Sequence, residues 1–221
     1  MEHNVQRQDW MSNEVFDWAQ REEKARLNSL ERLNAGGWKT LIAIKAQHPL
    51  NPDGTPGPEY TQRLEEALRV AHDCEMRGLG VEFMVFGGIH EGCKTTTLAT
   101  AGGNWLVAHG VDKFSITAQP TVFSGNDEDR MAAEYFNSDV DFSELHVILS
   151  AGQWERSRLY FYTMGWQPFL HPIVFLDAKP NHSTVCELWG AWAVPAFAKG
   201  PAAIEAATEE IRQKHKAEAS K

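Results

Sequence analysis

The chain has 221 residues, of which 43% are hydrophobic, and it carries eight tryptophans. This length and composition are enough for one sizeable core and allow one or two domains. The formal net charge of −9 argues against a nucleic-acid partner, because binding many phosphates requires a basic face. No stretch reaches the roughly 18 apolar residues that a membrane span needs. The N-terminal MEHNVQRQDW also lacks the order of a signal peptide, so we expect no membrane partner.

The cysteine pattern indicates a reducing compartment. Cys74, Cys93 and Cys186 are odd in number and widely spaced, so neither a disulfide framework nor a zinc knuckle is predicted. We therefore expect a soluble, cytoplasmic protein.

The first half of the chain alternates between predicted helices and strands. A helix is expected over 13–34, where a broken apolar stripe ends at consecutive glycines. The β-branched run 38–46 predicts a buried strand, and a loop rich in proline and glycine follows it. An amphipathic helix over 60–78 and a second buried strand over 81–88 come next.

The second half continues the alternation and defines the fold class. Strands separated by helices indicate βαβ units, so we predict an α/β fold: one three-layer Rossmann-like domain with a mostly parallel, five-stranded sheet. The domain is expected over 38–200, after an N-terminal helical extension (1–37) and before a C-terminal helix and charged tail (201–221) that is expected to be a solvated end. The remaining predicted elements are a helix over 95–109, a strand over 113–119, a helix over 128–137, a strand over 144–152, a helix over 155–165 and a strand over 168–176.

Polar loops follow the predicted strands. In such folds ligands bind beyond the carboxyl ends of the strands. That rule selects the loops 48–60, 87–97, 120–129 and 150–156, all of which are rich in glycine, hydroxyl, amide or charged residues. We expect the functional site where these four loops meet, with His48 as a polar lining residue or a plain loop residue.

The stretch VFGGIHEGCKTTTLATAGGNWL nearly matches the phosphate-binding pattern G-x-x-x-x-G-K-[ST]. Gly87 and Gly92 have the required separation, but Cys93 intrudes before Lys94. One extra residue rotates the lysine by about 100° in a helix of about 3.6 residues per turn, so a Walker loop is not predicted.

The same turn has other ways to meet an anion. Gly87 and Gly88 allow a ligand to approach the backbone closely. Thr95 and Thr96 present hydroxyls near a helix start, where free N–H groups favour negative charge. The alternative is a capped turn without a ligand.

The order of the motifs over residues 40–190 resembles the YdcF-like family, the group that contains SanA and ElyC. The parts that carry the resemblance are TLIAIKAQHPLNPDGTPGPEYTQRLEEAL with its helix from Arg63, VEFMVFGG, WLVAHGV, ILSAGQWERSRLYFYTMGW and CELWG. The resemblance implies a Rossmann-like fold, cell-envelope roles for membrane-anchored members and S-adenosylmethionine binding for a soluble one. Because this chain shows no anchor, we give the envelope role less weight.

Three positions depart from the family pattern. The Glu-Ala pair expected after the paired glycines is Leu98-Ala99, and the histidine expected after the fourth strand is Gln153. The T-x-x-N motif of the third loop becomes Asn126 to Asp129, whereas the arginine of the fourth loop is retained as Arg156. The loss of a carboxylate and a histidine predicts a changed ligand or chemistry.

The catalytic candidates are His90, Glu91 and Asp129. A histidine beside a carboxylate can act as a general base near neutral pH, with a solvated surface pair as the alternative. Paired carboxylates in SGNDEDR can bind Mg²⁺ or divide acid and base duties, or they can simply suit the N-terminus of a helix. Asn126 is a ligand-binding candidate in the same motif.

The ligand-binding candidates also include Arg156 and Arg63. An arginine beyond a strand is a natural fork for a carboxylate or phosphate, and the second arginine is expected to face the same cleft. Gln153 can only hydrogen-bond, and Trp154 could stack on a flat ring or belong to the core. We predict no metal ligands, because the histidines and acids near the C-terminus (His171, His182, Glu187) are too dispersed for zinc.

These observations predict an enzyme that acts on a small anionic metabolite, nucleotide- or phosphate-containing, by hydrolysis or group transfer. A non-catalytic protein that binds S-adenosylmethionine or a nucleotide is the alternative, and an S-adenosylmethionine-dependent transferase is a third interpretation. S-adenosylmethionine and Mg²⁺ both stay open as cofactors, and no oligomeric state is predicted.

Overall fold

A computed structural model describes residues 27, 29–47, 49–89, 95–163, 168–173 and 201–219. Short 3₁₀ turns at Lys113–Ser115 and Ala151–Gln153 precede β3 and α5 respectively. The strands and long helices are β1 (Lys39–Ile44), α2 (Pro58–Met76), β2 (Gly80–Phe86), α3 (Leu98–Ala108), β3 (Ile116–Gln119), α4 (Gly125–Ser138), β4 (Phe142–Ser150), α5 (Trp154–Thr163), β5 (Phe169–Ile173) and α7 (Pro201–Ala219).

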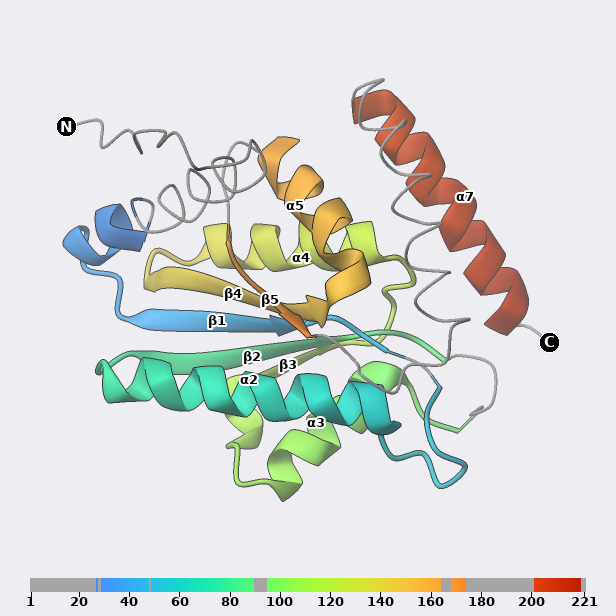
Figure 1. Ribbon diagram of the computed structural model, residues 1–221, viewed down its shortest axis with the longest axis horizontal. Helices are drawn as coiled ribbons and strands as arrows, with labels where there is room; N and C mark the ends of the chain where they lie inside the picture. Colours follow the sequence, from blue (N-terminus) through green and yellow to red (C-terminus); the bar gives the residue numbers. More distant parts are fainter. Residues whose placement is uncertain are drawn as a thin grey trace, which may run out of the picture.

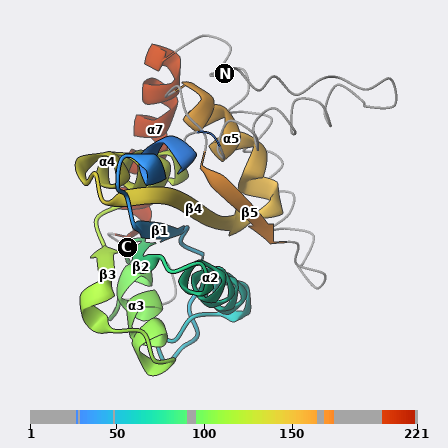
Figure 2. The same ribbon diagram turned by 90° about the vertical axis from the view of Figure 1, so that its left-hand side faces the viewer.

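The five strands form one sheet in the order β3-β2-β1-β4-β5, and every pair is parallel (Figure 1). Helices α2 and α3 cover one face, and α4 and α5 cover the other (Figures 1 and 2). The predicted α/β Rossmann-like fold with a five-stranded parallel sheet is therefore confirmed. The strand order advances from β1 to β3 on one side and then returns to β4 on the other, so the winding reverses between β1 and β4.

Alternating side chains of β1 supply both cores. Ile42 and Ile44 pack with Leu64 of α2 on one face, and Leu41 packs with Ala133 of α4 on the other. All five are fully buried, as expected for a parallel strand covered on both faces, which reads as a continuous apolar run.

Helix α4 begins three residues before its predicted start at 128. Ser124 caps the helix: its Oγ accepts a hydrogen bond from the backbone N–H of Asp127 at 3.1 Å. The cap moves Asn126 and Asp129 out of the predicted loop and into the first turns of a helix.

The strand predicted over 113–119 is only partly extended. Asp112 accepts the N–H of Phe114 at 3.0 Å and caps a 3₁₀ turn, so β3 is limited to Ile116–Gln119. At the opposite edge of the sheet, β5 tolerates Pro172 because an edge strand has unpaired backbone groups on one side.

Helix α7 lies near the N-terminal end of α4 (Figure 1). Thr208 accepts a hydrogen bond from Asn126 at 2.9 Å, and Arg212 forms a two-point ion pair with Asp127 at 2.5 and 2.7 Å. The sequence predicts a solvated end here, but these residues dock the helix against α4.

Of the helix predicted over 13–34, residues 27 and 29–34 are described and are helical. Within the described residues, every helix is too short or too polar to cross a membrane.

Candidate functional site

The carboxyl ends of β1 and β4 lie side by side, with Ile44 opposite Ile148. The chain leaves β1 toward α2 on one face and leaves β4 toward α5 on the other (Figure 2). Ligands of open α/β sheets bind at such a reversal. The candidate site therefore consists of residues that follow these two strands and of the side chains that meet them.

Lys45 follows β1 and is fully buried. Its Nζ donates to Asp129 Oδ1 at 2.7 Å, to the carbonyl of Gly125 at 2.7 Å and to Ser157 Oγ at 3.0 Å. Ser157 in turn donates to Asp129 Oδ2 at 2.9 Å. Burial lowers the pKa of Lys45, against the opposing effect of Asp129. Asp129, a predicted catalytic residue, thus has both carboxylate oxygens bonded inside the protein.

Glu128 adds a second carboxylate to this network. Its Oε1 accepts the N–H of Ala46 at 2.9 Å, and its Oε2 lies 3.7 Å from Lys45 Nζ. Burial raises the pKa of Glu128, which Lys45 opposes. Lys45 and Glu128 were not among the residues predicted from the sequence, although a lysine directly after an apolar strand is a signal that a buried partner is needed.

Arg63 joins the ends of both strands from α2. Its Nη1 donates to the carbonyls of Lys45 and Ala46 at 2.7 and 2.9 Å, and its Nη2 donates to Gln47 and Ser150. The side chain is fully buried. Through these contacts Arg63 links the segments that follow β1 and β4.

Arg156 lies in the first turn of α5, and its guanidinium packs on the first residue of α4. A Cβ added to Gly125 would lie 2.0 Å from Arg156 Nη2, so only glycine leaves room for this contact. The Nε of Arg156 is buried and has no hydrogen-bond partner among the described residues. A helix N-terminus already carries partial positive charge, and Arg156 adds a full charge there. The two together favour an anion at this position.

Two further buried atoms at this end of the sheet have no donor within the described part of the chain. They are Oε1 of Gln153, in the 3₁₀ turn after β4, and Oδ1 of Asn126, whose amide nitrogen is used by Thr208. A buried polar atom without a partner costs about 1–3 kcal/mol, so such atoms call for an explanation. Hydrogen bonds to a ligand would provide one.

Gly87 and Gly88 are explained by packing within the chain. Gly87 has a φ of +108°, and a Cβ there would lie 2.7 Å from the Cβ of Leu98. A Cβ on Gly88 would lie 2.4 Å from the ring of Phe123. The carbonyl of Gly88 also accepts the N–H of Leu98 at 3.1 Å. The glycines therefore allow the turn to pack against α3 and its neighbours.

Three other predicted residues, Thr95, Thr96 and Trp154, lie beside the starts of helices. Helix α3 is capped by Thr97, whose Oγ accepts the N–H of Thr100 at 3.0 Å, while Thr95 and Thr96 precede the cap. Trp154 opens α5 half-buried, with Arg158 above its ring at 5.3 Å. His48, His90 and Glu91 lie outside the described residues.

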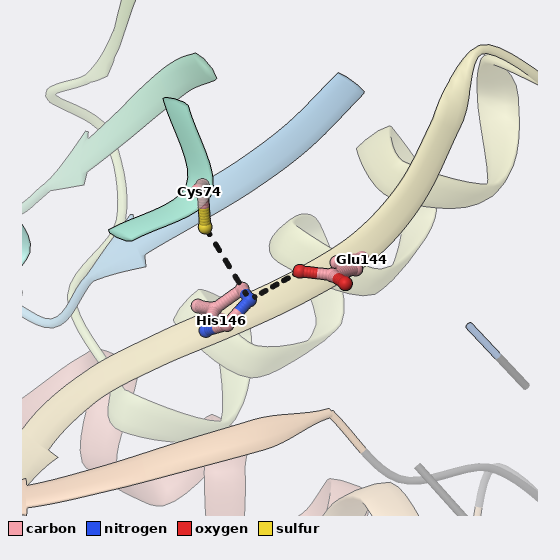
Figure 3. Close-up of side chains that lie close together, drawn as sticks. All are labelled: Cys74, Glu144 and His146. Carbon is pink, nitrogen blue, oxygen red and sulfur yellow. Dashed lines mark hydrogen bonds and ion pairs between the residues drawn. The ribbon is translucent and has the colours of Figure 1, made fainter. Parts of the chain in front are cut away.

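A second polar cluster lies on the face of the sheet that α2 covers. His146 Nε2 is 3.0 Å from Glu144 Oε2 and 3.9 Å from Cys74 Sγ, as Figure 3 shows. Arg77, at the end of α2, binds both oxygens of Glu144 at 2.6 Å, and its Nη2 lies 3.1 Å from Cys74 Sγ. On the other side of the ring, His146 Nδ1 is 2.8 Å from His171 Nε2.

The cluster strongly perturbs its own protonation. Burial favours neutral Glu144, but hydrogen bonds from His146 and Arg77 outweigh it and lower the pKa of Glu144 to about 2. Burial opposes charge on His146 as well, yet its contacts with Cys74 and Glu144 raise its pKa. The pKa of His171 is lowered to about 4, mainly by burial and to a smaller extent by the neighbouring His146.

This cluster was not predicted from the sequence. Glu144 and His146 are two residues apart in a strand and so share a face, which is a visible signal. The approach of Cys74 depends on how α2 packs on that face, and no local pattern encodes it.

Comparison with protein-family models, curated proteins and solved structures finds no match for this chain. Function is therefore inferred from the geometry of the two clusters.

Proposed function

We propose that this chain binds a small anionic metabolite at the carboxyl ends of β1 and β4. The observation that carries the proposal is the guanidinium of Arg156 against Gly125 at the N-terminus of α4, with its buried Nε lacking a partner among the described residues. A planar guanidinium and free helical N–H groups suit a phosphate or carboxylate. Gln153 and Asn126 supply acceptors for the hydroxyl or amine groups of the same ligand.

The ligand class that fits this set is a nucleotide or another phosphate-containing metabolite. S-adenosylmethionine is the second candidate, because its carboxylate can use Arg156 and its ring can use Trp154 at the start of α5. Membership of the YdcF-like family is part of the same proposal. The order of its motifs along the chain and the Rossmann-like sheet support it.

Binding without catalysis is the function that the described residues favour. Among the predicted catalytic residues, Asp129 is described, and its carboxylate is held by Lys45 and Ser157. Hydrolysis or group transfer would depend on His90 and Glu91 and stays a second proposal on the sequence alone. The odd, scattered cysteines support a reducing, cytoplasmic setting.

The test is a thermal-stability screen of the full chain with inorganic phosphate, nucleoside mono- and diphosphates and S-adenosylmethionine, each with and without Mg²⁺. A ligand at one hundred times its Kd stabilises the fold by about 2.7 kcal/mol. We expect at least one of these anions to stabilise the wild type and Arg156→Gln to abolish the effect. Release of product from the stabilising ligand would then support catalysis, and an unchanged ligand would support binding alone.

Arg69→Gln is the matched control, because Arg69 is an exposed arginine that pairs with Glu66 and Asp73 on α2. It should leave ligand stabilisation unchanged. The proposal fails if none of the anions stabilises the wild type, or if Arg156→Gln responds to the ligand as the wild type does.

A further inference from the structure

The cluster of Cys74, Glu144 and His146 combines three kinds of metal-binding donor at one point. Their donor atoms all lie within 4.8 Å of one another, and all three side chains are buried (Figure 3). We propose that these three residues bind a divalent transition-metal ion, with Zn²⁺ as the expected metal. The site is separate from the anion site and does not depend on it.

The donor set matches zinc in chemistry and in size. Zinc binds thiolate sulfur at about 2.3 Å, imidazole nitrogen at about 2.0–2.1 Å and carboxylate oxygen at about 2.0–2.2 Å. Tetrahedral ligands at those lengths are about 3.5 Å apart. The nitrogen of His146 lies 3.9 Å from the sulfur of Cys74 and 3.0 Å from the oxygen of Glu144. All three atoms lie within 4.8 Å of one another, so metal binding requires side-chain rotations that bring them to these separations.

The surroundings of His146 orient it for metal binding. Its Nε2 faces Cys74 and Glu144, and its Nδ1 lies 2.8 Å from Nε2 of His171. When a metal ion replaces the Nε2 proton that Glu144 accepts, the proton on Nδ1 is donated to His171 and the Nε2 lone pair is directed at the metal. His171 is held in turn near Glu66, with 3.8 Å between Nδ1 and Oε1. Metal-binding histidines commonly have their second nitrogen held in this way.

Arg77 is the competitor for the site. Its guanidinium contacts both Glu144 and Cys74, which is where the positive charge of a metal ion would lie. The side chain is 49% exposed, whereas that of Glu144 is 4% exposed. Arg77 is therefore able to move into solvent as the metal enters. This contact distinguishes a metal site from a fixed ion pair, because removing Arg77 should improve metal binding and not only weaken the fold.

The ligand set also sets the metal preference. Sulfur and imidazole donors select zinc and cobalt over Mg²⁺ and Ca²⁺, which prefer six or more oxygens. Three protein ligands leave the fourth tetrahedral position for water or another small ligand.

The experiment titrates the full chain, reduced and treated with a chelator, with Co²⁺ and follows the visible and near-ultraviolet spectrum. We expect one equivalent to bind with tetrahedral bands and a thiolate charge-transfer band, and Zn²⁺ but not Mg²⁺ to displace it. Cys74→Ser should remove the charge-transfer band. Cys93→Ser and Cys186→Ser are matched controls that should keep it.

Two variants keep the test informative if substitution of a buried ligand disturbs folding. Arg77→Ala should bind Co²⁺ about tenfold more tightly or better, because the metal no longer displaces a charge-assisted pair. His171→Gln should bind roughly 10- to 100-fold more weakly. A wild type without the charge-transfer band overturns the proposal, as does a band that survives Cys74→Ser or an Arg77→Ala variant that binds no more tightly than the wild type.

Discussion

The two polar clusters of this fold hold their carboxylates in different ways. In the first, Lys45 is the cation paired with both Asp129 and Glu128, and its side chain is 1% exposed. In the second, Arg77 neutralises Glu144 from a side chain that is half in solvent. A buried cation cannot leave without stranding its partners in a low-dielectric interior. A half-exposed cation can move into solvent when another cation takes its place beside the carboxylate. The first cluster is therefore suited to holding β1, α4 and α5 together, and the second to exchanging its cation.

Lys45→Met should have the largest effect on stability. It removes the cation from between two buried carboxylates, and breaking a buried ion pair from one side costs about 3–5 kcal/mol. Urea denaturation of the variant and the wild type measures the change. Lys39→Met on the same strand is the control, because its pairs with Glu82 and Asp139 are partly exposed and should contribute about 1 kcal/mol or less. A Lys45→Met variant no less stable than this control would remove the contrast between the clusters.

Arg77→Met should have the second-largest effect, about 1–3 kcal/mol, measured without added metal. Glu144 would lose two charge-assisted hydrogen bonds, but water can replace part of the exposed guanidinium. The double variant Arg77→Met, Glu144→Gln should recover part of the loss, because the stranded charge is gone. A loss equal to that of Lys45→Met would mean that the fold depends on the cation of the second cluster as strongly as on that of the first.

The fold was more accessible from the sequence than either cluster. Apolar strands alternating with capped amphipathic helices predicted the parallel sheet, because each pattern is local. Lys45 shows why the clusters were harder to predict: its partners Asp129 and Ser157 are 84 and 112 residues away along the chain. Those contacts exist only once the strand order is set, and that order is a property of the whole chain.

The same limit applies to individual residues. Arg63 is predicted from the sequence to bind the ligand, but it donates to main-chain carbonyls, and that contact depends on how closely α2 approaches β1. Gly125 carried no sequence signal, because its importance lies in the approach of Arg156 from another helix. Sequence patterns predicted the edge of the sheet where a ligand is expected, and packing determines which polar groups there keep atoms without a hydrogen-bond partner.

Arg212→Gln tests a third ion pair, intermediate between the two clusters in exposure. Arg212 is 20% exposed and its partner Asp127 is 7% exposed, so we expect a loss of about 1–2 kcal/mol and faster hydrogen exchange in α7. Burial opposes charge on Asp127, but Arg212 and Ser124 outweigh it and lower the pKa of Asp127 below its ordinary value of 3.8. A carboxyl group whose pKa is lowered by folding stabilises the fold at pH values above its ordinary pKa. That stabilisation is lost as the pH falls through the pKa of the folded state.

The free energy of unfolding should therefore be larger for the wild type than for Arg212→Gln near neutral pH. The two values should converge at low pH, where Asp127 is protonated in both proteins. Arg130→Gln is the control, since Arg130 reaches the same carboxylate at 3.3 Å from a more exposed position and should change stability by about 0.5 kcal/mol or less. A stability difference between wild type and Arg212→Gln that stays constant through the acid range would show that the pair with Asp127 does not hold α7.

Gly125→Ala should have the smallest effect on stability and a clear effect on binding. Its carbonyl would still accept from Lys45, so the first cluster stays intact, and alanine suits a helix at least as well as glycine. The new Cβ would displace the guanidinium of Arg156, which is the end of a flexible side chain and can move. We expect stability within about 1 kcal/mol of the wild type and anion affinity lower by about tenfold or more.

Gly103→Ala is the control for that substitution, because a Cβ there would meet only ordinary contacts at 3.7 and 3.9 Å from Ile116 and Val85. Denaturation of both variants measures the effect on stability, and ligand titration measures the effect on anion affinity. Together they separate the two roles of this helix end. If Gly125→Ala and Gly103→Ala bind phosphate-containing ligands equally well, the position of Arg156 beside the N-terminus of α4 is not what attracts the anion. If only Gly125→Ala loses affinity at unchanged stability, the buried network supports the fold and the guanidinium of Arg156 is needed for the anion.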